Sequence, residues 1–428
     1  MLGSTAPGAR TAPREQLAGD DGDRQATDLE IDVRDGLLPP ADTPAARTAA
    51  RAAARLSAPW PSWPSPPAPE AGALDAVQEP VEDLLSRFLA ERVAELCALD
   101  PALEAIGREV EQLVACGGKR LRPAFVYWGH RATGAAHDEG CFWPAAAVEL
   151  LHTFALIHDD VMDRSPERRG RPAVHAALTS THTREGMVGD PRWFGVGGAI
   201  LAGDLAFVWA DQLLDDSPLP PAALTLARRV FNELRVEVMA GQYLDLRLAG
   251  MPAATRRDAL RVALLKSGRY TVTRPLQLGA ALGGAQTGGA EVDLRALDQA
   301  LTAYGDAVGI AFQLRDDVLG LFGDPSETGK GAVEDLREGK RTVLILRALE
   351  LSGPTERAAL LAVLGSEDLE ESDALRARDI VVSSGALDFV ERCMSEQLEH
   401  ACEALVGVQA PAAPALAELA ELALFRRG

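Results

Sequence analysis

The sequence predicts an all-α protein in which one large helical bundle follows an N-terminal extension. Aromatic residues make up only 5% of the 428 residues, and alanine and leucine dominate, a balance that favours helix over sheet. From about residue 75 onward, apolar residues recur at steps of three and four, the period of an amphipathic helix. None of these runs shows the convincing alternation of a strand.

The helical runs follow one another along the chain. In the first run, 81–100, Leu85, Leu89 and Val93 recur every fourth residue between charged positions. The later runs share this kind of spacing and lie at 103–115, 145–157, 200–214, 222–243, 256–282, 294–321, 341–351, 355–364, 370–383, 386–405 and 415–425. A chain of about 350 residues with this pattern predicts a many-helix bundle forming one domain, residues 75–428.

Residues 1–74 lack this periodicity and are expected to form a disordered extension. Eleven of the 27 prolines lie in residues 1–70, ending in the run PWPSWPSPPAPE. Such a composition buries too little apolar surface to fold alone. An N-terminal tail is the simplest interpretation, ahead of a proline-rich ligand anchored by Trp60 and Trp63.

The charge balance excludes one class of partner. The chain has 43 Lys and Arg against 63 Asp and Glu, a formal net charge of −20. This argues against nucleic acid or an anionic membrane surface as the main partner. A bound phosphate would therefore need help from a cation.

Cysteine usage and hydropathy point to the cytoplasm. The five cysteines are scattered and never in a CxxC spacing, so neither a disulfide framework nor a zinc site is implied. The N-terminus has no apolar signal-peptide region, and the most apolar stretch, 194–210, is interrupted by glycines and by Asp204. We expect no signal peptide and no stable membrane insertion.

Two acidic pairs stand at the ends of apolar runs. In the first, Asp159 and Asp163 are i, i+4 neighbours on one helix face, about 6 Å apart at Cβ, with Asp160 about 100° round the helix. Like charges placed this way repel, which favours neutralisation by a hard cation such as magnesium. In the second, Asp316 follows an apolar run with Gln313 one turn earlier on the same side. One such pair is typically just solvated, but two are less easily explained that way.

Basic residues accompany each acidic pair. The segment GGKRLRP at 117–123 places Lys119, Arg120 and Arg122 after two glycines and before a helix. Backbone free of Cβ atoms and fixed guanidinium donors can hold a phosphate there. Further basic residues follow the two aspartate pairs: Arg168, Arg169, Lys330, Lys340 and Arg341. Carboxylates ringed by Lys and Arg are what a magnesium–diphosphate substrate requires.

These motifs resemble the trans-isoprenyl diphosphate synthases, the polyprenyl synthetase family. The matching segments, in the family's order, are GGKRLRP at 117, DDVMD at 159 with RRG at 168, AGD at 202, GQYLDL at 241, KSGRYT at 266, FQLRDD at 312, and GDPSETGK with DLREGKRT running to 342. The resemblance covers some 350 residues. It implies the isoprenoid synthase bundle, usually a homodimer, with the two aspartate motifs facing each other across a central cavity.

The resemblance also assigns the metal ligands. Asp159 and Asp163, supported by Asp160, would hold magnesium ions that grip an allylic diphosphate. Asp316 would ligate a third Mg²⁺. The implied reaction is ionisation, condensation and elimination: diphosphate departs, the double bond of isopentenyl diphosphate attacks the allylic carbocation, and the proton lost goes to the departing diphosphate.

Substrate-binding residues are carried over motif by motif. Those expected to contact the allylic diphosphate are Arg168, Lys266, Lys330 and Lys340. Those expected to bind isopentenyl diphosphate are Lys119, Arg122, His152 and Arg169. Those expected beside the forming cation are Gln313 and Ser267. Lys266 and Gln313 are expected to act in catalysis as well as binding. Either His152 or His158 could simply be a helix histidine whose hydrogen bonds are satisfied within the fold. His152 is preferred because it lies two turns before Asp159 along the same face.

Two departures from the family pattern leave the expected activity in place. Gly320 stands where many relatives have a third aspartate, and Ser267 where threonine is usual. Neither change removes the first metal ligand of the second motif or the hydroxyl. The polar stretch 179–192 has no chemical explanation in the sequence.

The product length is predicted from the residues five and four before the first aspartate. Phe154, an aromatic, and Ala155, a small residue, in a motif without an insertion resemble the short-chain synthases that make geranylgeranyl diphosphate. A twenty-carbon product is therefore expected, with farnesyl or longer polyprenyl diphosphates as alternatives, and carotenoids as one destination. The preferred allylic primer, which could be dimethylallyl, geranyl or farnesyl diphosphate, stays open.

Three other functions are weaker. A class I terpene cyclase would need an Asn/Ser/Glu metal triad, and the single asparagine, Asn232, has Val236 rather than a hydroxyl residue at i+4. An inactive regulatory subunit would not need both aspartate motifs. A metal-storage bundle would want Glu-x-x-His spacings on facing helices, which the sequence lacks.

Overall fold

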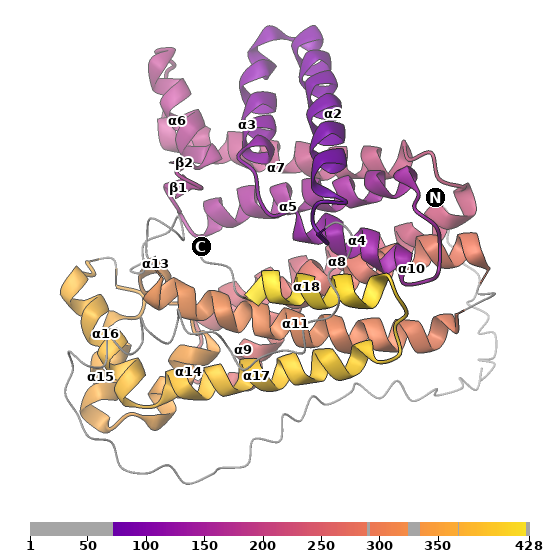
Figure 1. Ribbon diagram of the computed structural model, residues 1–428. Coiled ribbons are helices and arrows are strands. Elements are labelled where there is room, and N and C mark those ends of the chain that lie inside the picture. Colours follow the sequence, from indigo (N-terminus) through magenta and orange to yellow (C-terminus); the bar gives the residue numbers. More distant parts are fainter. Residues whose placement is uncertain (1–71, 289–291, 324–333, 367, 425–428) are drawn as a thin grey trace, which may run out of the picture. The chain divides into compact units, whose positions relative to one another are not determined.

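The computed structural model describes residues 72–288, 292–323, 334–366 and 368–424. Their helices are α2 (Gln78–Leu99), α3 (Glu104–Ala115), α4 (Leu121–Arg131), α5 (Phe142–Met162), α6 (Val174–Arg184), α7 (Pro191–Asp215), α8 (Pro221–Ala249), α9 (Arg256–Val262), the π-helix η3 (Ala263–Thr273), α10 (Arg274–Thr287), α11 (Leu294–Phe322), α13 (Glu334–Arg337), α14 (Val343–Leu351), α15 (Pro354–Val363), α16 (Glu371–Ser383), α17 (Ala386–Leu405) and α18 (Ala412–Leu424). The all-α prediction is confirmed (Figure 1).

Within the described residues every predicted helical run corresponds to helix, and the structure adds elements the sequence did not reveal. The run 256–282 is divided by η3, a segment of i→i+5 hydrogen bonding, which is rare and often found at functional sites. α6 was not predicted, and α4 was expected only as a helix of unstated extent after the segment 117–123. Among the described residues the only strands are β1 (Glu167–Arg168) and β2 (Arg171–Pro172), which pair antiparallel.

The core is built around α5, which carries the first aspartate motif. α5 packs along α7 and against α4, while η3 packs along α11, which carries the second aspartate motif. α10 crosses α4 at very close range, since a Cβ on Gly279 would lie 1.8 Å from the Val126 carbonyl oxygen. Only glycine permits this approach, so Gly279 allows the close packing of α10 on α4.

The start of the helical domain is anchored by the backbone of Ala73. Its carbonyl accepts a hydrogen bond from Trp128 Nε1 at 2.8 Å, and its N–H donates to Glu418 Oε2 at 3.0 Å. The chain has therefore joined the core just before α2. The expected extension, residues 1–74, lies outside the described residues up to position 71.

In the described part of the chain, two helices are long and apolar enough to cross a membrane by length and composition alone, a test that core helices of soluble proteins also pass. The most apolar window of the helix containing α5 is 78% buried within the protein, as expected of a core helix. The corresponding window of α7 is only 39% buried. α7 therefore presents a partly uncovered apolar face.

Candidate active site

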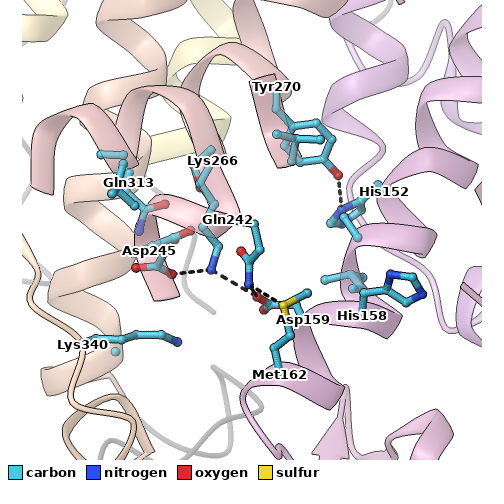
Figure 2. A pocket seen from close by; sticks show the side chains of 18 of the residues that line it. His152, His158, Asp159, Met162, Gln242, Asp245, Lys266, Tyr270, Gln313 and Lys340 are labelled. Atoms are coloured by element: carbon cyan, nitrogen blue, oxygen red, sulfur yellow. Dashed lines mark hydrogen bonds and ion pairs between the residues drawn. The ribbon is translucent and has the colours of Figure 1, made fainter. Parts of the chain in front are cut away.

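A cavity of about 1540 Å³ lies between α5, α8, η3 and α11, with the segment before α14 at its rim (Figure 2). The predicted site residues that line it are Lys119, Arg122, His152, Phe154, Ala155, Asp159, Arg168, Arg169, Lys266, Ser267, Gln313, Asp316 and Lys340. Asp160 and Asp163 stand behind this lining and contact residues that are part of it. Lys330 lies outside the described residues.

The first aspartate motif is tied to the opposite wall through Asp159. Its Oδ1 accepts hydrogen bonds from Gln242 Nε2 at 2.8 Å and Lys266 Nζ at 3.1 Å. Lys266 also contacts Asp245 Oδ2 at 2.6 Å. Burial alone would lower the pKa of Lys266, but the two carboxylates raise it. The two carboxylates thus favour the charged form of the lysine, whose ammonium group lies between Asp159 of α5 and Asp245 of α8 (Figure 2).

Asp160 supports the site from behind. It is 1% exposed and forms an ion pair with Arg168. Arg168 ends β1, and the turn after it has positive φ at both Arg169 and Gly170, the two-residue turn that closes a tight hairpin. The hairpin directs Arg168 towards Asp160, with Asp159 3.7 Å away. This arrangement fits the supporting role that the resemblance implied for Asp160.

Lys340 links the first motif to the segment that follows the second. Its Nζ lies 3.5 Å from Asp163 Oδ2 and 3.2 Å from Asp335 Oδ1, and it is paired with Glu338. Burial opposes its charge, but the carboxylates around it raise the pKa of Lys340 well above its ordinary value. A cationic group is therefore present between Asp163 of the first aspartate motif and Asp335, which follows the second motif.

The second motif contains a buried carboxyl at Asp317. Burial raises its pKa to about 8, partly offset by the hydrogen bond that Gln313 Nε2 donates to its Oδ1 at 2.7 Å, while Asp335 and Asp316 raise it further. The place beside Gly320, where many relatives have a third aspartate, is taken by the Asp335 carboxylate: a Cβ on Gly320 would lie 1.9 Å from Asp335 Oδ2.

The basic residues of the glycine-rich loop before α4 have different environments and different roles. Gly117, Gly118 and Arg120 all have positive φ, so the loop turns sharply into the helix. Arg120 is 5% exposed and bonded to Glu149 Oε1 at 2.6 Å and to the Val114 carbonyl. Arg120 therefore anchors the loop, whereas Lys119 is exposed on the cavity.

His152 and His158 lie on one helix with different partners. His152 Nδ1 is 2.7 Å from the hydroxyl of Tyr270. Burial, then the charges of Arg122 and Arg169, lower the pKa of His152 well below its ordinary value. His158 Nε2 instead reaches the Ile200 carbonyl at 3.0 Å. His158 is therefore engaged with α7 through its Nε2, although it also borders the cavity.

Phe154 forms part of an aromatic wall of the cavity. Its ring meets Phe207 of α7 edge-on at 5.1 Å between centroids and His158 at 4.7 Å. Ala155 lies beside it on the cavity lining. The aromatic wall is positioned where an apolar chain extending from the aspartates along α5 would meet it.

The donors of this site fit magnesium that arrives with diphosphate. No group of three or more His, Cys, Asp or Glu side chains in the described part of the chain encloses a single metal position. Mg²⁺ is commonly held by one or two carboxylates together with substrate phosphates and water. Carboxylates lining an open cavity, with Asp317 crowded by other acidic groups, provide such oxygen donors.

Four residues near the site were not assigned roles from the sequence. Gln242 and Asp245 contact the first motif and Lys266, and GQYLDL did contain a signal, because the two lie three residues apart on one helix face. Tyr270 and Asp335 also lie in motif segments, KSGRYT and DLREGKRT, but the partners they contact, His152 and the position of Gly320, appear only in the folded chain.

Comparisons with known proteins agree with this geometry. A family model described as polyprenyl synthetase matches residues 104–381. A geranylfarnesyl diphosphate synthase of Aeropyrum pernix is 35% identical over 302 residues, covering 70% of this chain and 86% of its own. A geranylgeranyl diphosphate synthase of Mycobacterium tuberculosis is 34% identical over 306 residues, covering 71% and 79%. Among solved structures, a geranylgeranyl pyrophosphate synthase of Corynebacterium glutamicum, complexed with isoprenyl diphosphate and magnesium, gives a TM-score of 0.76 at 36% identity, covering 82% of this chain and 99% of that one.

Proposed function

Because the chain belongs to the polyprenyl synthetase family, we propose that it condenses isopentenyl diphosphate with an allylic diphosphate to give geranylgeranyl diphosphate. It is a trans-prenyltransferase that uses a divalent metal. The observation that carries the proposal is one cavity lined by carboxylates from both aspartate motifs and by Lys266 and Lys340, with an aromatic wall on α5.

The chemistry follows from this arrangement. Bound Mg²⁺, for which we propose three ions, would stabilise the negative charge that develops on the departing diphosphate. Lys266 and Lys340, held charged by their carboxylate neighbours, would bind the same diphosphate. The apolar part of the cavity would exclude water from the carbocation.

Product analysis tests the proposal. With isopentenyl and farnesyl diphosphates as substrates and Mg²⁺ present, chromatography is expected to show a main product of twenty carbons. The geranylfarnesyl synthase among the relatives makes twenty-five carbons the alternative to measure against. A main product of thirty carbons or more would overturn the assignment.

Replacing Phe154 with alanine is expected to lengthen the main product by one or more five-carbon units. The ring is 9% exposed and packs on Phe207, so its removal opens space beyond the aromatic wall. Phe194→Ala, which truncates a 40% exposed ring that does not line the cavity, is the matched control and should leave the product unchanged. An unchanged product from Phe154→Ala would show that the wall lies elsewhere.

The exposed apolar face of α7 and α8 supports a homodimer. On α7 it includes Trp193, Leu201 and Val208, which are 74%, 58% and 52% exposed, and on α8 Val236 and Tyr243, which are 67% and 66% exposed. Such a face favours burial against another protein surface. We propose that a second copy of this chain covers it.

Replacing Val236 with glutamate is expected to convert the dimer to monomers, because the new carboxylate would be desolvated at the interface. Sedimentation velocity at micromolar concentration measures the change. Val406→Glu, at an 89% exposed position after α17, should leave the dimer intact. A wild-type monomer, or a Val236→Glu dimer, would contradict the proposed interface.

The structure gives little support to the two alternatives, a class I terpene cyclase and an inactive regulatory subunit. Asn232, the residue a terpene cyclase would need as a ligand, accepts a hydrogen bond from Arg235 and does not line the cavity. An inactive subunit would have no use for so complete a charged lining. We also propose a reducing, cytoplasmic location, which the five unpaired cysteines support.

A further inference from the structure

Tyr270 joins two residues at one end of the cavity that lie far apart in the sequence. Its hydroxyl is 2.7 Å from His152 Nδ1 on α5, as Figure 2 shows, and its ring lies under the Arg122 guanidinium, with 4.6 Å from Arg122 Cζ to the ring centroid. Arg122 is held further by its NH2 donating to Thr271 Oγ1 at 2.9 Å. All three side chains line the cavity or stand against it.

The direction of the hydrogen bond follows from what each partner can do. Tyr270 is 4% exposed, so its O–H has little access to water and needs a protein acceptor. The guanidinium of Arg122 carries only donors. His152 Nδ1 is therefore the acceptor, and the phenol donates to it.

This direction determines where the proton of His152 lies. Burial and the surrounding arginines lower the pKa of His152, and burial raises that of Tyr270, so both groups are neutral. A neutral imidazole that accepts at Nδ1 carries its hydrogen on Nε2. His152 thus offers the cavity an uncharged N–H donor of fixed orientation.

We propose that Tyr270 is a positioning residue for isopentenyl diphosphate: its hydroxyl holds His152 in the Nε2–H tautomer, ready to donate to the diphosphate, and its ring supports Arg122. The inference rests on the proposed function and deepens it. Arg122 and Arg169 already supply positive charge at this end of the cavity. Tyr270 adds to this by fixing the orientation of the uncharged donor, Nε2–H of His152.

Replacing Tyr270 with phenylalanine keeps the ring under Arg122 and removes only the hydroxyl. Loss of one oriented hydrogen bond is expected to raise KM for isopentenyl diphosphate about tenfold. KM for the allylic substrate and kcat should stay within about threefold, because those depend on the aspartate end. In a His152→Ala background, Tyr270→Phe should add no further increase.

The chain provides a matched control elsewhere. Tyr127 makes the same kind of contact, with its hydroxyl 3.0 Å from His137 Nδ1 and Arg131 5.9 Å from its ring centroid, away from the cavity lining. Tyr127→Phe should leave both KM values unchanged. An effect that is equal in the two variants would indicate a general loss of stability and would overturn the positioning role.

A measurement on the wild-type protein decides the tautomer, and a variant is needed only to assign the signals of His152. ¹⁵N NMR of labelled protein, with His152 assigned through His152→Ala, should show a protonated Nε2 and an unprotonated Nδ1. A protonated Nδ1, or an unchanged KM in Tyr270→Phe, would sink the inference. Calorimetric titration with isopentenyl diphosphate separates the two proposals. If the wild-type protein does not turn over isopentenyl diphosphate but Tyr270→Phe binds it about tenfold more weakly than the wild type, the proposed reaction fails and the positioning role stands. Equal binding by the two proteins would refute the positioning role.

Discussion

Asp159→Ala is expected to reduce turnover by about three orders of magnitude or more. Asp159 is the carboxylate at which α5, Gln242 and Lys266 meet. Its loss would remove an oxygen donor for the metal that neutralises the diphosphate. Metal stabilisation of a leaving group lowers the activation barrier by several kcal/mol, and each 1.4 kcal/mol corresponds to about a factor of ten in rate. The measurement is magnesium-dependent incorporation of labelled isopentenyl diphosphate into an allylic primer.

Asp204→Ala is the control for this loss. Asp204 also lines the cavity but is 61% exposed, and its pairing with His158 is at 4.0 Å. It should keep activity within about threefold of the wild type, since exposed pairs contribute little. Asp159→Ala should remain folded, because Lys266 retains Asp245 at 2.6 Å. Turnover within tenfold of the wild type would remove Asp159 from the metal site.

The helices were predictable where each carries its own apolar period. The run 386–405 coincides with α17, and 294–321 with nearly all of α11. The extent of α4 could not be predicted because the helix is buried all round, from Leu121 to His130 with little interruption, and so has no polar face to mark its period. α6, rich in threonine, has weak intrinsic helix propensity and packs along α7.

The site residues could be predicted only where they lie in a short segment of sequence with a recognisable pattern. Aspartates and basic residues that follow apolar runs indicated which carboxylates and which cationic groups line the cavity. The hydrogen bond between His152 and Tyr270 spans 118 residues, and no spacing rule relates such positions. The approach of Asp335 to Gly320 likewise appears only when the chain has folded back on α11.

The insertion of η3 shows a further limit. Its eleven residues continue the helical spacing of the run 256–282, yet the π-type turns change which side chains face the cavity. Lys266, Ser267 and Tyr270 all lie on this segment and reach the site. A periodicity of 3.6 residues could predict the helix but not this rotation.

Glu149→Ala is expected to lower the free energy of unfolding by about 3–5 kcal/mol, because it strands the buried charge of Arg120. The Glu149 and Arg120 side chains are only 5% and 3% exposed and bond at 2.6 Å. Arg120 also has a left-handed backbone, φ 49°, which costs of order 1–3 kcal/mol and is held in place by this pair. Urea unfolding followed by circular dichroism measures the change.

Glu82, a second acidic partner of Arg120, provides the control for the Glu149→Ala variant. It lies 3.4 Å from Arg120 Nε with its side chain 40% exposed, so Glu82→Ala should cost less than about 1 kcal/mol. The two variants remove the same charge from the same partner and differ chiefly in burial. If the pair anchors the loop, Glu149→Ala should also weaken binding of isopentenyl diphosphate, because Lys119 and Arg122 flank Arg120, whereas Glu82→Ala should not. Equal stability losses in the two variants would mean that Arg120 is solvated in the folded protein and that the loop before α4 is held by its glycine geometry alone.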